Sequence, residues 1–223
     1  MYKRQHEIKT PIFSIQGYLE ILADGAIEDI TTATKFIGKS QANVQRLVQL
    51  VNDIDIITNL EINKEPLLKH DFVIQDTIRD VINNLSIKLE KREIQFSFKK
   101  GCESPIHVFA DKNKIYQVLS NIITNAIKYG KQEGEIIASV YVLEDKKVLI
   151  EISDNGNGIS EEHIPRLFER FYRTDDARSR EVGGTGLGLA ICKHIIEAHG
   201  ESIQVRSKIN VGTTLGFTLP SKG

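Results

Sequence analysis

The first sixty residues repeat apolar side chains at the spacing of a coiled coil. Within about residues 3–23 they follow one another at intervals of four and three, at Ile8, Ile12, Ile15, Leu19 and Leu22. This spacing places them on one side of a helix. The same seam continues in a second helix, about residues 32–59, at Val44, Leu47, Val51 and Ile54. Two such helices joined by a short connection form an antiparallel hairpin. One hairpin cannot bury both seams, so we expect two copies to form a dimeric four-helix bundle.

The first helix carries a histidine beside a carboxylate on the side away from the seam. His6, Glu7 and Thr10 stand at i, i+1 and i+4, which clusters them on one side of a helix. Pro11 removes a backbone donor and clashes with the preceding turn, so we expect a kink there that exposes His6. Taken alone, the pattern also fits a simple interaction bundle. A zinc-peptidase helix is disfavoured, because Thr10 stands where that motif needs a second histidine.

Length and charge set broad limits. A chain of 223 residues suits two small domains, and a net charge of −1 gives no electrostatic reason to expect nucleic acid as a partner. Cys102 and Cys192 lack metal or redox spacing, which favours a reducing, cytoplasmic location. No apolar run reaches the ~18 residues of a membrane span. Helical periodicity begins almost at Met1 without a cap residue, so we expect this chain to be a soluble part of a longer, membrane-anchored polypeptide.

A second domain is expected after Glu65-Pro66, which gives domains of residues 1–66 and 67–223. We expect helices over about residues 73–91, 112–129, 161–169 and 187–199. Strands are expected over about residues 94–98, 107–110, 135–143, 148–153, 203–207 and 213–219. Helices interspersed with hairpin-connected strands indicate an α/β sandwich, in which helices cover one face of a mixed sheet. The whole chain is therefore predicted to be multidomain, α followed by α+β.

Two polar motifs of this domain fit a nucleotide. Asn121, Asn125 and Lys128 share one helix face, where amide oxygens can hold Mg²⁺ and the ammonium can neutralise phosphate. A solvated polar face is the alternative. Residues 154–159 (DNGNGI) place Asp154 at a strand end, where its carboxylate can accept a hydrogen bond from an exocyclic amine. A plain Asn-Gly turn explains this second motif equally well.

Two glycine motifs follow. Residues 183–190 (GGTGLGLA) run into a helix, and amides at a glycine-rich helix start bind phosphate. The run lacks the ending of a P-loop and the preceding strand of a Rossmann motif; a helix-capping turn is the alternative. The charged stretch 175–181 before it is expected to form a mobile lid. Residues 212–214 (GTT) precede the last strand and fit a simple turn.

The order of these motifs resembles that of the sensor histidine kinases of bacterial two-component systems. HExxTP, NxxxNAxKY, DxGxG, FERFYR (residues 168–173), GTGLGL and GTT follow one another as that family's H, N, G1, F, G2 and G3 boxes do. The resemblance covers nearly the whole chain. It is closest to the branch with a HisKA-type dimerisation and histidine-phosphotransfer hairpin and a GHKL-type ATP-binding domain. Gln5 stands where family members usually carry Ser.

The resemblance implies an ATP-dependent histidine autokinase that passes the phosphoryl group to an Asp of a response regulator. It further implies that the kinase also acts as a phosphatase of that regulator. His6 would be the phosphoacceptor, Glu7 its base, and Thr10 the residue that orients water in the phosphatase reaction. Asn125 would bind Mg²⁺. The exposed Phe13, one heptad beyond His6, is a candidate for docking the regulator's receiver domain.

The resemblance also implies a set of residues around the nucleotide. They are Asn121, Asn125, Lys128, Tyr129, Asp154, Gly156, Gly158, Ile159, Arg173, Gly184, Thr185, Gly186, Leu187, Gly188 and Thr213. Phe168 and Phe171 are expected to pack and position the lid. Two alternatives remain: a non-catalytic dimeric scaffold that binds nucleotide, and an ATPase of the gyrase, chaperone or mismatch-repair type. The His-Glu helix before the ATP-binding domain disfavours the second alternative.

Overall fold

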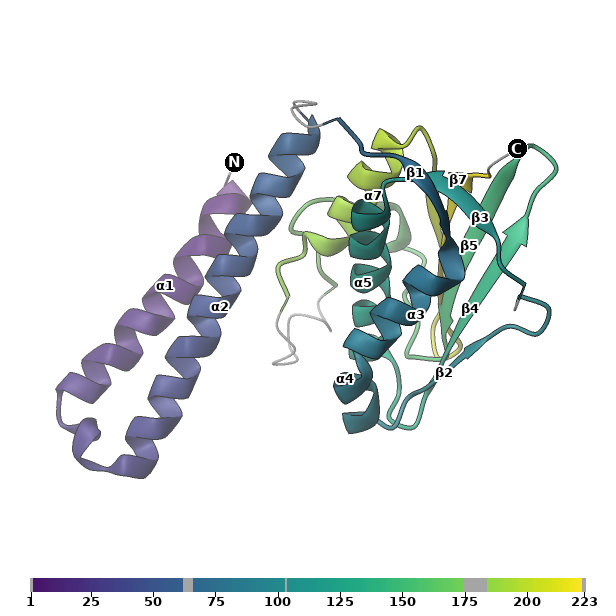
Figure 1. Ribbon diagram of the computed structural model, residues 1–223. Helices are drawn as coiled ribbons and strands as arrows, with labels where there is room; N and C mark the ends of the chain where they lie inside the picture. Colours follow the sequence, from purple (N-terminus) through teal and green to yellow (C-terminus); the bar gives the residue numbers. More distant parts are fainter. Residues whose placement is uncertain (1, 62–65, 103, 175–183, 222–223) are drawn as a thin grey trace. The chain divides into compact units, whose positions relative to one another are not determined.

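The computed structural model describes residues 2–61, 66–102, 104–174 and 184–221 (Figure 1). In residues 2–7 and 59–61 it describes the helical backbone alone. The chain divides into two compact units. The first consists of residues 1–58 and 169–187, and the second of residues 59–168 and 188–223. The predicted boundary at Glu65-Pro66 adjoins residues outside the described part and stays a prediction.

Two long helices form the hairpin of the first unit, as predicted. The elements are α1 (Tyr2–Ala23), the short 3₁₀ turn η1 (Ala26–Glu28) and α2 (Ile30–Glu61). Gly25 makes the turn with φ of 110°, a left-handed conformation that glycine adopts without strain. The Asp29 side chain accepts a 3.1 Å hydrogen bond from the Thr31 N–H and so caps the start of α2. Helix α1 continues through Pro11 without a break in its assignment, and the kink expected there stays a prediction.

The apolar seams of the hairpin are largely open in a single chain. Val44 is 48% exposed and Val51 is 55% exposed, although both belong to the predicted seam of α2. Among the α2 side chains that the structure describes, those buried within the chain are Ala33, Leu50, Asp53 and Ile57. The exposure of Val44 and Val51 does not contradict the predicted seam, because that seam is expected to pack against a second copy of the chain. It agrees with the expectation that one hairpin leaves apolar surface for a partner.

A mixed five-stranded sheet forms the centre of the second unit, as predicted. Its order is β2 (Gln95–Phe98), β4 (Glu135–Val142), β5 (Lys147–Asp154), β7 (Gly212–Pro220) and β6 (Ile203–Lys208). The β2–β4 pair is parallel and the other pairs are antiparallel. Burial alternates along β5, where Val148, Ile150 and Ile152 point into the core. This period of two is the pattern expected of a half-buried strand.

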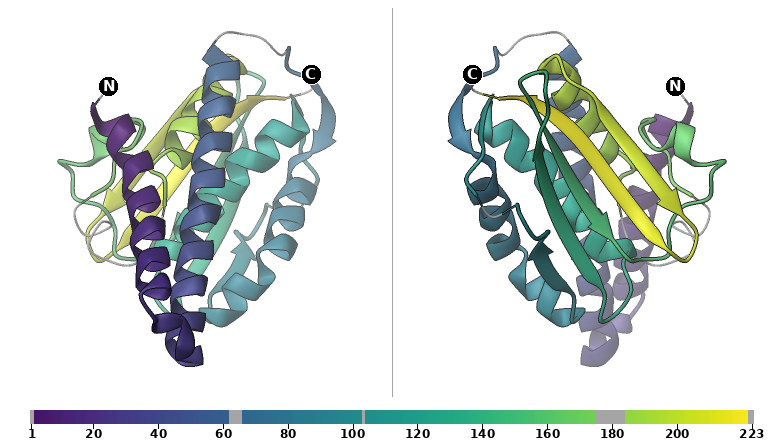
Figure 2. Two further views of the ribbon diagram at one scale, coloured as in Figure 1. Left: turned by 90° about the vertical axis from the view of Figure 1, so that its left-hand side faces the viewer. Right: turned by 90° about the vertical axis from the view of Figure 1, so that its right-hand side faces the viewer.

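Helices cover one face of this sheet (Figure 2). They are α3 (Ile74–Asn84), α4 (Ser86–Lys91), α5 (Lys112–Tyr129) and α7 (Gly188–Ala198). The core contains fully buried side chains from both layers, Ile78, Leu119 and Ile195 of the helices and Ile150 and Phe217 of the sheet. A separate two-stranded antiparallel sheet pairs β1 (His70–Val73) with β3 (His107–Ala110).

Three local predictions need correction. The helix expected over residues 73–91 is interrupted at Leu85, next to Asn83 and Asn84, which favour helix less than the preceding residues. The helix expected near residues 161–169 is only the 3₁₀ turn η2 (Ile164–Arg166), since Pro165 cannot donate the hydrogen bonds of a longer helix. Strand β1 was missed, because it is short and pairs only with β3.

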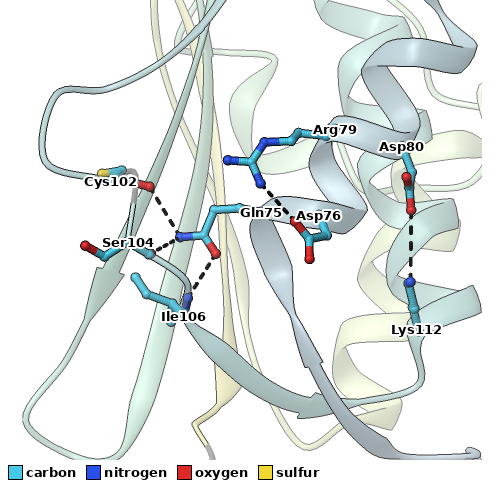
Figure 3. A network of polar contacts seen from close by, with 8 residues as sticks. All are labelled: Gln75, Asp76, Arg79, Asp80, Cys102, Ser104, Ile106 and Lys112. Carbon is cyan, nitrogen blue, oxygen red and sulfur yellow. Dashed lines mark hydrogen bonds and ion pairs between the residues drawn. The ribbon is translucent and has the colours of Figure 1, made fainter.

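A buried amide ties the loop before β3 to the helix layer (Figure 3). Gln75 of α3 donates to the carbonyl oxygens of Cys102 and Ser104 at 3.3 and 2.7 Å. Its Oε1 accepts from the Ile106 N–H at 3.0 Å. All polar atoms of this buried side chain are thereby paired, as burial demands. The contacts hold β3, and with it the start of α5, in place.

Candidate phosphoacceptor and nucleotide sites

The candidate phosphoacceptor lies near the start of α1. The backbone of His6 and Glu7 is helical, and their side chains are outside the described part of the structure. Thr10 is exposed and Pro11, the next residue, is buried. Phe13 is 64% exposed. Helix α1 therefore turns Thr10 and Phe13 away from the buried side, as the sequence predicted.

Helix α5 carries the first group of candidate nucleotide ligands. It begins at Asp111, whose carboxylate accepts from the N–H groups of Asn113 and Lys114 at 3.1 and 3.2 Å. Its apolar side faces the core, and Asn121, Asn125 and Lys128 are half-buried on another side. This partial burial disfavours the alternative of a fully solvated face.

Asn121 is tied to the start of α7. Its Nδ2 donates to the Gly188 carbonyl oxygen at 3.3 Å. At the other end of α5 the Lys128 ammonium lies 4.9 Å from the centre of the Tyr129 ring. The structure thus carries four predicted nucleotide residues on α5 and bonds one of them, Asn121, to the first residue of α7.

Asp154 lies at the end of β5, opposite Thr213 of β7. Its Oδ1 accepts a hydrogen bond of 2.9 Å from the Gly156 N–H. Burial raises the pKa of Asp154 above its ordinary value, and the backbone hydrogen bonds from Gly156 and Thr213 partly oppose this rise. The carboxyl group is therefore fixed in direction and only partly hydrated, which suits recognition of one hydrogen-bond donor.

The glycines around Asp154 are required by the protein's own backbone. A Cβ on Gly156 would lie 2.7 Å from the Tyr129 carbonyl oxygen. Gly158 has φ of 69°, and a Cβ there would collide with the carbonyl group of Lys208. A Cβ on Gly212 would collide with the carbonyl group of Asp154. These glycines let three loops meet at one place, in addition to any approach of a ligand.

Ser207, which the sequence analysis did not single out, joins two predicted site residues. Its hydroxyl accepts from the Ile159 N–H at 2.9 Å and lies 2.7 Å from Thr213 Oγ1. The Asn210 N–H donates to the Asn157 carbonyl at 2.7 Å, so the β6–β7 turn is bonded to the same loop. No motif marks Ser207, and only the fold brings it to this place.

The remaining candidates belong to the first unit. Arg173 Nη1 donates to the Gly184 carbonyl oxygen at 3.2 Å. The Phe171 N–H donates to the Gly186 carbonyl oxygen at 2.9 Å. Gly186 has φ of 70°, which favours glycine. Phe171 is buried, in agreement with the packing role expected of it. The predicted lid, residues 175–181, lies outside the described residues.

Thr185 of the glycine motif is bonded to the hairpin. Its Oγ1 accepts from the Leu187 N–H at 3.2 Å and donates to Asp53 Oδ2 of α2 at 2.8 Å. Asp53 Oδ1 accepts from Gln49 Nε2 at 2.7 Å. Burial raises the pKa of Asp53, and the hydrogen bonds from Thr185 and Gln49 partly oppose the rise. Asp53 belongs to no motif of the sequence; the only local signal for its burial is its place between the apolar residues Leu50 and Ile57.

Two absences hold for the part of the chain that the structure describes. There, no three His, Cys, Asp or Glu side chains gather as a metal site. None of the described helices is long and apolar enough to cross a bilayer.

Two family models match the chain. Residues 5–61 match the His Kinase A (phospho-acceptor) domain. Residues 110–223 match the histidine kinase-, DNA gyrase B- and HSP90-like ATPase family. The first match contains His6, and the second contains every predicted nucleotide residue.

Relatives and solved structures agree with these matches. The sensor histidine kinase WalK of Bacillus subtilis is 36% identical over 218 residues, which cover 97% of this chain and 35% of WalK. The chain thus spans about a third of the length of the curated relatives it matches. The histidine kinase AdeS of Acinetobacter baumannii superposes with a TM-score of 0.76 at 25% identity, covering 98% of both chains. The histidine kinase ThkA, solved in complex with the response regulator protein TrrA, gives 0.79 at 30% identity, covering 98% of this chain and 60% of ThkA.

The chain belongs to the histidine kinase-, DNA gyrase B- and HSP90-like ATPase family, and its two matched domains form the catalytic core of a two-component histidine kinase.

Proposed function

We propose that this chain is an ATP-dependent histidine autokinase that phosphorylates His6 and passes the phosphoryl group to an Asp of a response regulator. The observation that carries the proposal is the presence of a phosphoacceptor domain around His6 and an ATPase domain in one chain. A kinase of this kind needs both a nucleotide-binding surface and an acceptor.

In the proposed reaction, a neutral nitrogen of the His6 imidazole attacks the γ-phosphorus of ATP. An N–P bond forms, the bond from phosphorus to the β,γ-bridging oxygen breaks, and ADP leaves with that oxygen. Glu7 accepts the proton of the other ring nitrogen and so raises the nucleophilicity of the ring. Thr10, one turn after His6 on α1, is exposed, and this supports access of the phosphoryl donor ATP to the same side of the helix.

The second unit would hold the nucleotide. Asp154 would accept from the exocyclic amine of adenine, and its fixed, partly buried carboxyl group supports that role. Asn121, Lys128 and Tyr129 would lie along the phosphates and sugar, with Thr213 and Ile159 beside the base. Gly156, Gly158 and Gly188 would allow backbone to approach the ligand.

The residues present fit a magnesium ion. Asn125 is half-buried on the same face as Asn121, and its amide oxygen is a ligand of the type that Mg²⁺ accepts alongside phosphate oxygens and water. When bound, Mg²⁺ would neutralise charge on the transferring phosphoryl group. Arg173, Gly184, Thr185, Gly186 and Leu187 would close over the phosphates.

The open seams of the hairpin support a homodimer, since Val44 and Val51 need a partner to leave water. A receiver domain as partner is supported by ThkA, which was solved with the response regulator protein TrrA.

The proposal includes a phosphatase activity on that regulator, in which Thr10 orients the attacking water. A cytoplasmic site of action agrees with the two free cysteines, Cys102 and Cys192. The domain boundary near residue 66 is likewise proposed.

The test is incubation with magnesium and γ-labelled ATP, followed by addition of a receiver domain. We expect label on the chain that is lost in acid and kept in alkali, and that then moves to the receiver domain. Nucleotide binding without any label would favour the non-catalytic scaffold instead.

A further inference from the structure

Arg92 lies between α4 and β2 and binds the end of α5. Its Nη1 donates to the Lys128 carbonyl oxygen at 2.9 Å, and its Nη2 donates to the Gly130 carbonyl oxygen at 2.8 Å. Its own carbonyl oxygen accepts from the Glu133 N–H at 3.1 Å. Arg92 therefore holds both ends of the segment 128–133.

This arrangement suits an arginine in particular. The last carbonyl groups of a helix lack donors within the helix, and a cation is favourable at that end. The guanidinium is a rigid fork of donors that stays charged, so one side chain can serve two carbonyl groups at once. Arg92 is half-buried, which strengthens these charge-assisted hydrogen bonds.

The segment that Arg92 holds packs directly on the loop after β5. The Tyr129 carbonyl oxygen accepts from the Asn157 N–H at 3.5 Å. A Cβ on Gly156 would lie 2.9 Å from Gly130 Cα, so the two backbones are in close contact. Gly156 in turn donates to Asp154 Oδ1 at 2.9 Å. A continuous series of backbone contacts thus runs from the Arg92 side chain to the Asp154 carboxyl group.

We propose that Arg92 is a positioning residue that sets the direction of the Asp154 carboxylate and thereby the selectivity for the nucleotide base. This inference rests on the proposed function, in which Asp154 reads adenine. Arg92 acts through the backbone, since its side chain donates to the carbonyl oxygens of Lys128 and Gly130. Its loss changes how well the base is bound and distinguished, and leaves the transfer step of the bound nucleotide intact.

The experiment compares the full chain with Arg92→Ala, Arg92→Lys and the control Arg79→Ala. Arg79 is an exposed arginine of the same unit that pairs with Asp76 at 2.9 Å (Figure 3) and takes no part in this series of contacts. Dissociation constants are measured for ATP and for inosine triphosphate, whose base has no exocyclic amine. KM and kcat of autophosphorylation are measured with ATP.

In Arg92→Ala we expect a KM for ATP raised about tenfold with kcat nearly unchanged, which corresponds to loss of charge-assisted hydrogen bonds. The ratio of the dissociation constant for inosine triphosphate to that for ATP, which measures the preference for ATP, should fall in the same variant. Arg92→Lys should recover part of the affinity for ATP and part of the preference for it, because an ammonium can serve one carbonyl group. Arg79→Ala should behave as the unmodified chain.

Equal losses of affinity for the two nucleotides, or a fall in kcat at constant KM, would overturn the inference and leave Arg92 a general stabilising residue. An unmodified chain that binds ATP without preferring it would overturn the proposed role of Asp154 as well. If Arg92→Ala does not fold, Arg92→Lys carries the same comparison with a smaller expected fall in the ratio.

Discussion

The imidazole of His199, at the end of α7, accepts a hydrogen bond of 3.0 Å from the backbone N–H of Asp111, the residue that caps α5. The other ring nitrogen lies 2.8 Å from the Ile195 carbonyl oxygen and donates to it. Both contacts require a neutral ring with its proton on Nδ1. The Asp111 carboxylate also accepts from the Leu68 N–H at 3.0 Å. His199 and Asp111 together therefore join the end of α7, the start of α5 and the backbone at Leu68.

The first prediction concerns pH. Burial lowers the pKa of His199, and the charge of Lys69 lowers it further. The hydrogen bond to Ile195 and the charges of Asp111 and Glu201 partly oppose this lowering. A depressed pKa means that stability is fully present above the unfolded value of about 6.5 and is lost as the pH falls through the lower folded value. Urea unfolding at a series of pH values measures this loss. In His199→Gln, whose amide oxygen can still accept from Asp111, that part of the pH dependence should disappear. An unchanged pH profile would contradict the assignment.

The second prediction concerns the loop contact at Gly158. Gly158→Ala should destabilise the second unit, because φ is 69° and the new Cβ collides with the Lys208 backbone. The matched control is Gly101→Ala, where φ is 89° but nothing lies within 4 Å of the new Cβ. The control should cost about 1–2 kcal/mol of backbone strain, and Gly158→Ala about 1–3 kcal/mol more from overpacking. Thermal unfolding measures the loss of stability in each variant. Equal losses would contradict the prediction and show that the loop rearranges to accommodate the new Cβ.

The third prediction concerns the buried carboxyl group of Asp53. Thr185→Val removes the hydroxyl that donates to it, so the pKa of Asp53 should rise further above its ordinary value. A raised pKa contributes stability that is present at low pH and is lost as the pH rises through the folded value. The variant should therefore be destabilised at neutral pH by about 1–3 kcal/mol. Thr185→Ser, which keeps the hydroxyl, is the control. Titration of the Asp53 carboxyl carbon by NMR checks the shift, and an unaltered titration would contradict it.

The fourth prediction concerns the exposed ring on α1. Phe13→Ala should slow transfer of the phosphoryl group to a receiver domain by about tenfold, the size of effect seen for a contact residue of an interface. Autophosphorylation should stay near normal. Ile87→Ala, which truncates another exposed apolar residue on the second unit, should change neither rate. Equal losses of the autophosphorylation and transfer rates in Phe13→Ala would contradict this prediction and show that the ring stabilises the hairpin instead.

The sequence predicted best those elements whose signals are local. The helix expected over residues 112–129 matches α5 because its apolar period and its capping residue, Asp111, lie side by side in the chain. The antiparallel pair β4 and β5 was predicted for the same reason, since a short polar turn joins two alternating runs. The motifs of α5 and of the loop at Asp154 likewise stand on the predicted elements.

Contacts between distant segments could not be predicted. Asp53, Arg92 and His199 act on partners elsewhere in the chain, and no local pattern marks those partners. The family resemblance places Gly156 and Gly158 of the Asp154 loop around the nucleotide. The structure adds that backbone from β6 and α5 already occupies the space beside them. On α2, Asp53 is buried among apolar residues because its carboxylate accepts hydrogen bonds from two donors, Gln49 and Thr185.

The central claim is that His6 is the phosphoacceptor, and the most direct measurement is the position of the phosphate. The full chain is incubated with magnesium and ATP, kept alkaline, and its peptides are sequenced by mass spectrometry beside the His6→Gln variant. We predict phosphate on the imidazole of His6 and none on the variant. Phosphate on a serine, threonine or another histidine, or equal phosphorylation of His6→Gln, would contradict the account.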